Sequence, residues 1–484
     1  MRTNINLKRT QSAKFVRLIA LIGTLCLSIS AQAENDRSYL PHEKYELENG
    51  LEVILHQDKK TGSVAVSLWA HVGGLNEKKG RSGFAHLFEH LMFQGTPHVG
   101  DDMHFKYLQQ AGAKSINGTT SFDRTNYFEV VPANELELAL WLESDRLGWL
   151  MEGVNQAKLD EQREVVKNER LQRIENRPYG LGQEKLWQAM FPVSHPYHGR
   201  VIGSMADLDA ASMDDVKDFF GQFYAPSNMT LTLAGNFDKE EAKSMIQRYF
   251  GSIPKGPKPI LATIPQPTIS EEIRMTHPET LGKLPRITVS YFTPPFFEPG
   301  DAEMDILSHV LAGTKTSRLR KHLMELEERA QSVQVYQQSM KNISVFNVDV
   351  VLRKDENPEE VLSIIDARLN ELFDLPPTED EIARAIASIQ TNKIFGLQAI
   401  GGYSGRAEQL QRFNHYLGEP DWLAQDIERY QKVTPEDIVK MMETYLVSDK
   451  RAVLFSLPRD KRGVEDMKKI KDSFIKTNSK GDAQ

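Results

Sequence analysis

A partial internal repeat is the feature that most constrains the fold of this 484-residue chain. The stretch FYAPSNMTLTLAGNFDKE, residues 223–240, is echoed by YLVSDKRAVLFSLPRD, residues 445–460. In both stretches a polar turn leads into apolar residues with the pattern of a strand. A repeat at this separation predicts two copies of one unit of about 200 residues, which is an ordinary domain size.

The strands and helices that the sequence predicts follow a similar order in each half. The first half begins with a hairpin at an Asn-Gly turn, a buried strand in SVAVSLWAHVGG and a helix. In the second half RITVSYFTPP precedes a helix over residues 302–323, and SVFNVDVVLR is a further strand. Proline-rich residues 257–270 form the expected linker. We therefore expect an α+β protein with two homologous domains, each a mainly antiparallel sheet packed with helices, over residues 34–256 and 271–484.

The first 33 residues have the pattern of a signal peptide. They combine a basic start, the apolar run LIALIGTLCLSIS and the small residues AQA, with cleavage expected after Ala33. The apolar run is shorter than the roughly 20 residues that a membrane span needs. A membrane anchor is one alternative, and a lipoprotein attached through Cys26 is another, although Leu25 stands where a small residue is expected. We expect a periplasmic or secreted protein with no membrane span.

Removal of this segment would leave a strongly acidic chain. Five basic residues and no acidic ones would be lost, which would change the formal net charge from −8 to −13. Such a charge disfavours nucleic acids and anionic membranes as partners. Cys26 is the only cysteine, so the mature chain would have neither disulfides nor reactive thiols.

The stretch GFAHLFEHLMFQGTP, residues 83–97, places two histidines in a helix-favouring run. His86 and His90 would lie one turn apart on one helix face, where both can reach the same metal ion. Glu89 shares that side of the helix. A catalytic zinc takes three protein ligands and keeps one position open, so a third ligand must come from elsewhere. The alternative is an ordinary polar helix face with unliganded histidines.

The order H-x-x-E-H, with its flanking residues, resembles the signature of the pitrilysin/insulinase family of inverted-motif zinc peptidases, the inverzincins. In that family the third ligand is a glutamate about 75 to 80 residues farther on. Here EQREVVKNER supplies Glu169, 79 residues after His90. The stretch NGTTSFDRTNY, residues 117–127, matches a second family pattern, with Gly118 in place of an alanine. The chain resembles small-subunit members, such as the mitochondrial processing peptidase beta subunit, and bacterial exported relatives.

This resemblance implies an exported zinc endopeptidase that acts on peptides or unfolded segments. Zn²⁺ would be held by His86, His90 and Glu169, with water in the open position, where the ion lowers the pKa of that water. Glu89 would take a proton from the water and pass it to the leaving amine.

The resemblance also implies how a peptide would bind. The strand SINGTTS would form a sheet edge to which the substrate adds as another strand, with Asn117 and Gly118 contacting its backbone. A purely structural strand is the alternative. Larger members of the family carry another glutamate where this chain has Gln162. The nearby Glu164 is given no metal role, because a solvated helix face explains it as well.

Complete enzymes of the family use an arginine and a tyrosine from the half-molecule that faces the zinc domain. The best counterpart here, LMELEERAQSV, has Met324 and Gln331 at these positions, and neither can act as a cationic clamp or a phenol donor. Tyr403 and Arg406 do not fit in spacing or order. We therefore expect the catalytic half of a two-chain enzyme, a heterodimer with a homologous subunit that carries the arginine–tyrosine pair, or alternatively a homodimer.

Two other classes of function remain open from the sequence. One is a non-catalytic structural or peptide-binding subunit of the same fold, and the other is a metal-storage protein. The presence of all four residues of the predicted centre favours the peptidase, because a structural subunit needs none of them. Replacement of Glu89 by glutamine separates these classes, since only a peptidase would lose hydrolysis while keeping its metal.

Overall fold

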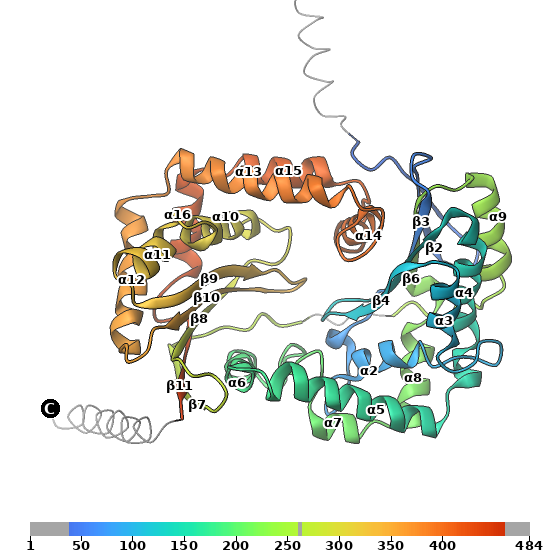
Figure 1. Cartoon of the computed structure of the whole chain (residues 1–484), viewed down its shortest axis with the longest axis horizontal. Helices are drawn as coiled ribbons and strands as arrows, with labels where there is room; N and C mark the ends of the chain where they lie inside the picture. Colours follow the sequence, from blue (N-terminus) through green and yellow to red (C-terminus); the bar gives the residue numbers. More distant parts are fainter. Residues whose placement is uncertain (1–37, 260–263, 460–484) are drawn as a thin grey trace, which may run out of the picture.

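Two sheets form the framework of the molecule, one in each half (Figure 1). The computed structural model describes residues 38–259 and 264–459. The first sheet has the order β1-β2-β6-β3-β5-β4 and the second the order β7-β11-β8-β10-β9. The strands of the first sheet are β1 Glu43–Glu46, β2 Glu52–Gln57, β3 Ser63–Ala70, β4 Lys114–Thr120, β5 Thr125–Pro132 and β6 Met229–Gly235. Those of the second are β7 Ile273–Glu279, β8 Arg286–Thr293, β9 Ala330–Gln338, β10 Ser344–Leu352 and β11 Ala452–Pro458.

The two sheets share one connectivity. β2 pairs in parallel with β6, and β7 pairs in parallel with β11. Every other pairing in either sheet is antiparallel. The prediction of a duplicated α+β fold with mainly antiparallel sheets is therefore confirmed.

The helices also follow one order in the two halves. In each helix, apolar residues at helical spacing form a face that packs against a sheet or a neighbouring helix. The first half contains α2 Phe84–Leu91, α3 Met103–Gln110, α4 Leu136–Gly153, α5 Gln156–Arg170, α6 Gly180–Met190, α7 Met205–Asp209, α8 Met213–Phe223 and α9 Lys239–Phe250. The second contains α10 Asp301–Ala312, α11 Arg318–Lys321, α12 Pro358–Asp374, α13 Glu379–Gly396, α14 Arg406–Leu417, α15 Leu423–Gln431 and α16 Pro435–Tyr445.

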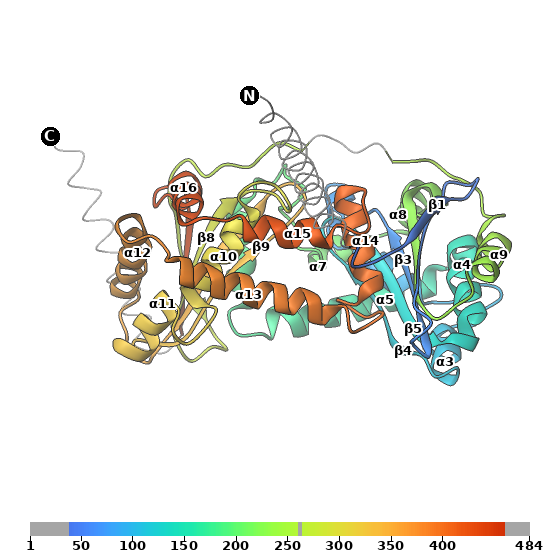
Figure 2. The ribbon, with the colours of Figure 1, turned by 90° about the horizontal axis from the view of Figure 1, so that it is seen from above.

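A helix from the opposite half covers the second face of each sheet. α14 packs on β3 and β6 of the first sheet, and α6 packs on β7 and β11 of the second. The alternation of β3 accounts for the first contact: Val66 and Leu68 enter the core under α2 and α4, whereas Ser67 and Trp69 point the other way. Glu408 of α14 accepts hydrogen bonds from Ser67 Oγ and, at 3.0 Å, from Trp69 Nε1. The helices α13 and α15 run from the second half toward this contact (Figure 2).

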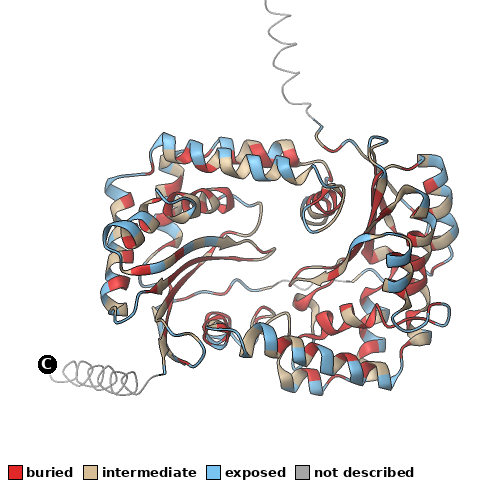
Figure 3. Ribbon diagram, in the orientation of Figure 1, coloured by how far each residue is buried: buried red, intermediate tan, exposed pale blue. Residues whose placement is uncertain are grey.

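Buried residues concentrate where the sheets meet their helices, and the outer helix faces are exposed (Figure 3). Each half has a large apolar core of its own. A smaller core joins the halves through Phe122, Trp187 and Phe191 of the first and Val345 and Leu454 of the second. The cavity described below lies between the halves.

The structure departs from the predicted elements in the second half. The single helix predicted over residues 302–323 is wrong, because the chain leaves the helix between α10 and α11. There Ser317 Oγ donates to the carbonyl of His309 at 2.8 Å and accepts from the N–H of Thr314 at 3.0 Å, replacing helical hydrogen bonds. The strand β7 was not predicted.

The expected signal peptide, residues 1–33, and the C-terminal tail lie outside the described residues. Residues 254–259 and 264–269, within the expected linker region, form neither helix nor strand. Within residues 38–259 and 264–459, the structure contains no helix whose length and apolar character would let it cross a bilayer.

Candidate zinc and peptide site

The motif helix α2 begins at a close contact between two glycines. Gly83 has a φ of 85°, and a Cβ atom on it would lie 2.5 Å from the Cα of Gly203. Gly83 has no side chain to cap the helix, so Glu77 does this from outside. Its carboxylate accepts the backbone N–H of Gly83 at 3.1 Å and that of Ala85 at 2.9 Å. The first turn of α2 is therefore held by contacts on both sides.

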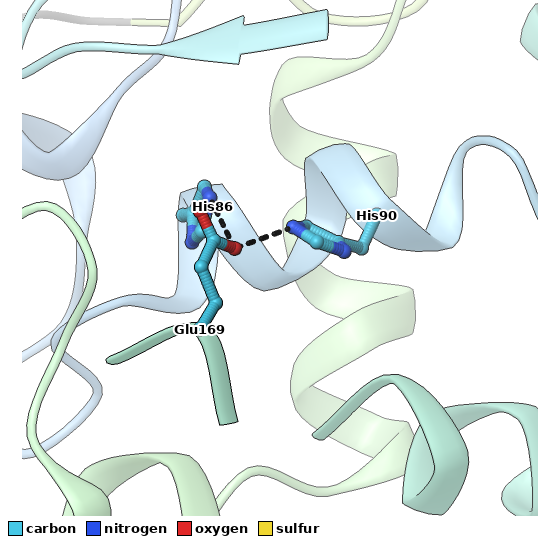
Figure 4. A group of neighbouring side chains, drawn as sticks. All are labelled: His86, His90 and Glu169. Carbon is cyan, nitrogen blue, oxygen red and sulfur yellow. Dashed lines mark ion pairs between the residues drawn. The ribbon is translucent and has the colours of Figure 1, made fainter. Parts of the chain in front are cut away.

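Three donor atoms converge between α2 and the last turn of α5 (Figure 4). Glu169 Oε2 lies 3.6 Å from His86 Nε2 and 3.3 Å from His90 Nε2. The histidines are one turn apart on α2, and their rings meet edge to face with centroids 4.8 Å apart. The three ligand candidates named from the sequence thus lie together, although 79 residues separate His90 from Glu169.

This donor set has the spacing that a zinc ion requires. Donor atoms about 2.0–2.1 Å from a tetrahedral zinc lie about 3.3 Å from one another, and two imidazole nitrogens with one carboxylate oxygen form a known catalytic set. Arg173 Nε binds the other oxygen of Glu169, Oε1, at 2.9 Å. This contact leaves Oε2 turned toward the histidines. The residues present therefore fit zinc.

The electrostatics of the three residues favour a cation. Burial lowers the pKa of His86 to about 4, and the neighbouring His90 acts in the same direction. For Glu169 burial acts to raise the pKa, but the hydrogen bond to His90 and the charges of His86 and Arg173 outweigh it and leave the pKa lowered. A neutral His86 and an ionised Glu169 are the forms in which these side chains bind metal.

Glu89 lies beside this centre, on the side that faces β4. Its Oε2 accepts a hydrogen bond from Thr120 Oγ1 at 2.6 Å. Gly118 packs against it so closely that a Cβ atom there would lie 2.9 Å from Glu89 Cγ and Oε1. Burial raises the pKa of Glu89, although the bond from Thr120 opposes this shift. A buried carboxylate with a raised pKa is suited to accept a proton.

A cavity of about 770 Å³ opens at this centre. The strand β4, which lines it with Asn117 through Thr120, is the outermost strand of the first sheet. Its outer backbone edge has no neighbouring strand among the described residues. The opposite wall comes from the second half and includes Gln338, Ser339 and Met340. An extended chain in this cavity can therefore reach both a free sheet edge and Glu89.

The two positions that align with the arginine–tyrosine pair of the family lie away from the cavity. Met324 packs against the core of the second half, and Gln331 is exposed on β9. The second glutamate position of larger relatives, Gln162, is buried and does line the cavity. Glu164, also on α5, does not line the cavity and pairs with Lys167 at 2.9 Å.

Two residues of the cavity wall were not predicted from the sequence: Tyr403 had been set aside on its spacing from Arg406, and Arg173 had not been named. Tyr403 accepts a hydrogen bond from Asn117 Nδ2, whereas the nearby Arg406 pairs with Asp58 at 2.7 Å outside the cavity. Arg173, which orients Glu169, also lines the cavity. The glycines around Tyr403 signalled a loop, but nothing in the sequence indicated that this loop reaches β4.

Two protein-family models match the chain, one after the other along the sequence. The family model described as "Insulinase (Peptidase family M16)" matches residues 52–194, which include α2 and Glu169. The model described as "Peptidase M16 inactive domain" matches residues 210–389. The chain is 26% identical to a zinc protease PqqE of Helicobacter pylori over 450 residues, which cover 91% of this chain and 98% of that protein.

Solved structures match nearly the whole described fold. A protease from Helicobacter pylori superposes with a TM-score of 0.79 at 24% identity, covering 87% of this chain and all of that one. The first half of the periplasmic protease PqqL from Escherichia coli superposes with a TM-score of 0.69 at 17% identity, covering 86% and 92%. Because two models of one family match in succession along the duplicated fold, the chain belongs to the pitrilysin/insulinase family (M16) of zinc peptidases.

Proposed function

We propose that the chain is a zinc-dependent endopeptidase that hydrolyses peptides or unfolded segments. His86, His90 and Glu169 would bind Zn²⁺, and Glu89 would be the general base. The observation that carries the proposal is the position of Glu89, buried between the donor cluster and the free edge of β4. A metal-storage site has no use for such a carboxylate.

Zn²⁺ bound at this centre would supply a water of lowered pKa and would polarise the scissile carbonyl. The chain's own residues do the rest. Glu89 would take the proton released during attack and deliver it to the leaving amine. Thr120 holds Oε2 of Glu89, which limits the directions from which the carboxylate can receive the proton.

The peptide would bind as an additional strand on β4. Asn117 and Gly118 would contact its backbone, so that affinity would depend little on sequence. The absence of a side chain at Gly118 lets Glu89 approach the same segment. Residues 34–256 would form the catalytic domain, and residues 271–484 a second domain without zinc ligands.

We propose further that this chain works with a homologous subunit that supplies an arginine and a tyrosine to the cavity. The positions of Met324 and Gln331 away from the cavity support this need. A homodimer is the alternative, in which the second copy would not supply this pair. The expected signal peptide, and the periplasmic location stated for the relative PqqL, support action in the periplasm or outside the cell.

The test is hydrolysis of quenched peptides by the zinc-loaded chain, alone and with homologous subunits. Glu89→Gln should lower kcat about 10²–10⁴-fold and leave bound zinc unchanged. A chelator should abolish turnover of the wild type, and added zinc should restore it. Glu164→Gln is the matched control, because this acid on α5 is paired with Lys167 outside the cavity.

Retention of full activity by Glu89→Gln would contradict the proposed mechanism. Peptide binding without turnover, with every subunit tried, would instead identify a peptide-binding subunit of this fold. The two outcomes are separated by measuring peptide affinity and turnover on the same protein sample.

A further inference from the structure

Tyr403 is an aromatic side chain exposed inside the cavity. Its exposed fraction is 72%, the highest among the large hydrophobic side chains in the described part of the chain. It nevertheless lines the cavity that contains the donor cluster and Glu89. Large exposed aromatic groups in such a position are typical of contact surfaces for a ligand.

The loop that carries Tyr403 is fixed on the first sheet, although it belongs to the second half. Gly401 lies so close to β3 and β5 that a Cβ atom there would be 2.7 Å from Ala65 Cβ and Val130 Cγ2. The following Gly402 has a φ of 80°, which a residue with a side chain adopts at a cost. The N–H of Ala407 closes the loop on the carbonyl of Ile400 at 3.0 Å. Tyr403 is therefore presented by a defined backbone.

Two contacts place the phenol of Tyr403 on β4 and β5. Its hydroxyl accepts a hydrogen bond from Asn117 Nδ2, and its ring meets Phe128 edge to face with centroids 5.3 Å apart. Asn117 and Phe128 are direct cross-strand partners, so their side chains share one face of the sheet. Gly118, the next residue, faces Glu89 on the other side.

This geometry divides the side chains of an added strand into two sets. A peptide paired with β4 would point alternate side chains to opposite faces, one set toward Glu89 and the donor cluster and the other toward Tyr403. The regular edge begins at Asn117, because the register shifts between Lys114 and Asn117 and Ser115 has a φ of 56°. Tyr403 thus stands at one end of the usable edge, close to the point opposite Glu89.

We propose that Tyr403 is a specificity and positioning residue for the peptide, an inference that rests on the proposed function. Its ring, backed by Phe128, selects a large apolar or aromatic substrate side chain adjacent to the scissile bond. Its hydroxyl fixes the amide of Asn117, so that Asn117 Oδ1 is left to accept a backbone N–H of the peptide. The substrate class is an extended peptide with such a side chain at this single position.

The experiment measures peptide affinity in the zinc-loaded Glu89→Gln chain, so that binding is observed without turnover. The probes are fluorescent peptides identical except at one residue, which is Phe, Leu, Ala or Lys and is moved along the sequence. Tyr403→Ala should weaken binding of the Phe and Leu peptides about tenfold at one position and leave the Ala peptide within about twofold. Tyr403→Phe should keep the preference and weaken all peptides by a similar, smaller factor, because only the bond with Asn117 is lost.

The matched control is Phe395→Ala, which removes an aromatic side chain that is 60% exposed at the end of α13 and does not line the cavity. It should change no affinity. Equal weakening of all peptides by Tyr403→Ala, no weakening, or undetectable binding would each overturn the inference. Turnover of the same peptides is then measured with Glu89 restored, for the chain alone and with homologous subunits. A preference that depends on Tyr403 without any turnover would reject the proposed function alone, and turnover with a preference independent of Tyr403 would reject this inference alone.

Discussion

The helices α2 and α10 occupy the same place in the two halves, but their polar residues have different kinds of partner. Those of α2 face another possible metal ligand, and those of α10 face hydrogen-bond donors of the protein. On α2 the histidines face Oε2 of Glu169 of α5, and Arg173 binds the other oxygen of this carboxylate, Oε1. On α10 Asp301 pairs with Arg429 at 2.6 Å, and Asp305 accepts from Tyr430 at 2.7 Å. The first arrangement leaves three donor atoms turned toward one another, as a bound cation requires, and the second is complete within the chain.

The duplicated fold thus supports two ways of pairing buried charges at one location. A buried charge must be paired, either by a protein group or by an ion. In the second half Arg429 also binds Asp426 at 2.7 Å, which closes an ionic network around α10. Evidence for a metal centre therefore lies in unpaired donors as much as in the presence of histidines.

The largest effect should come from breaking the open centre. His90→Ala should reduce bound zinc from about one ion per chain to none and lower kcat/KM about 10³-fold, because several kcal/mol of transition-state stabilisation are lost. Asp305→Asn, the matched change on α10, should leave both unchanged. Metal analysis after dialysis measures the bound zinc, and turnover of a quenched peptide measures kcat/KM. Zinc that persists in His90→Ala would place the metal elsewhere.

A smaller effect should distinguish the starts of the two helices. Glu77→Ala leaves the N–H groups of Gly83 and Ala85 without their partner and should cost about 1–2 kcal/mol of stability. It should also weaken zinc binding, because the first turn of α2 carries His86. Glu303→Ala removes only the bond to the N–H of Gly300 on α10, and zinc affinity should not change. Thermal unfolding with zinc titration compares the variants, and equal zinc affinities would refute the coupling.

The smallest effect concerns a buried acid in each sheet. On β5, burial and the charge of Glu143 raise the pKa of Glu129, and Arg146 opposes this only in part. The folded protein thus keeps a proton that the unfolded chain releases near the ordinary pKa of glutamate. Its stabilising contribution is present below that pKa and is lost as pH rises through the raised pKa. Glu129→Gln should remove this loss and stabilise the protein by about 1 kcal/mol at pH 8, with less gain near pH 4.

On β10, Asp349 has its own cation, because Arg286 lies 2.7 Å from its Oδ2. Asp349→Asn should therefore lower the melting temperature across the same pH range, as Arg286 loses its partner. Melting curves of both variants from pH 4 to pH 8 provide the comparison. A Glu129→Gln gain that did not depend on pH would point to packing rather than to the proton.

Local spacing was enough to place the two histidines and Glu89 on one side of a helix, since one helical turn fixes their separation. The strand patterns and their order were likewise sufficient for the duplicated α+β fold. Glu169 was identified through the resemblance to a known family, because no local rule relates it to His90. The place of Tyr403 in the cavity could not be predicted, since its contact with Asn117 spans 286 residues and depends on how the halves pack. The capping of α2 by Glu77 was not predicted either, because it depends on the path of the loop that brings Glu77 to the helix.

The exchange of helices between the halves has a consequence for synthesis. Ser67 and its partner Glu408 are 341 residues apart. At about 5–20 residues per second, Glu408 is made roughly 20–70 s after Ser67. During that interval the first sheet has one uncovered face, with the donors Ser67 and Trp69 still unpaired. The first half thus cannot finish folding before the ribosome has made most of the second half, and a nascent chain stays open for much of its synthesis.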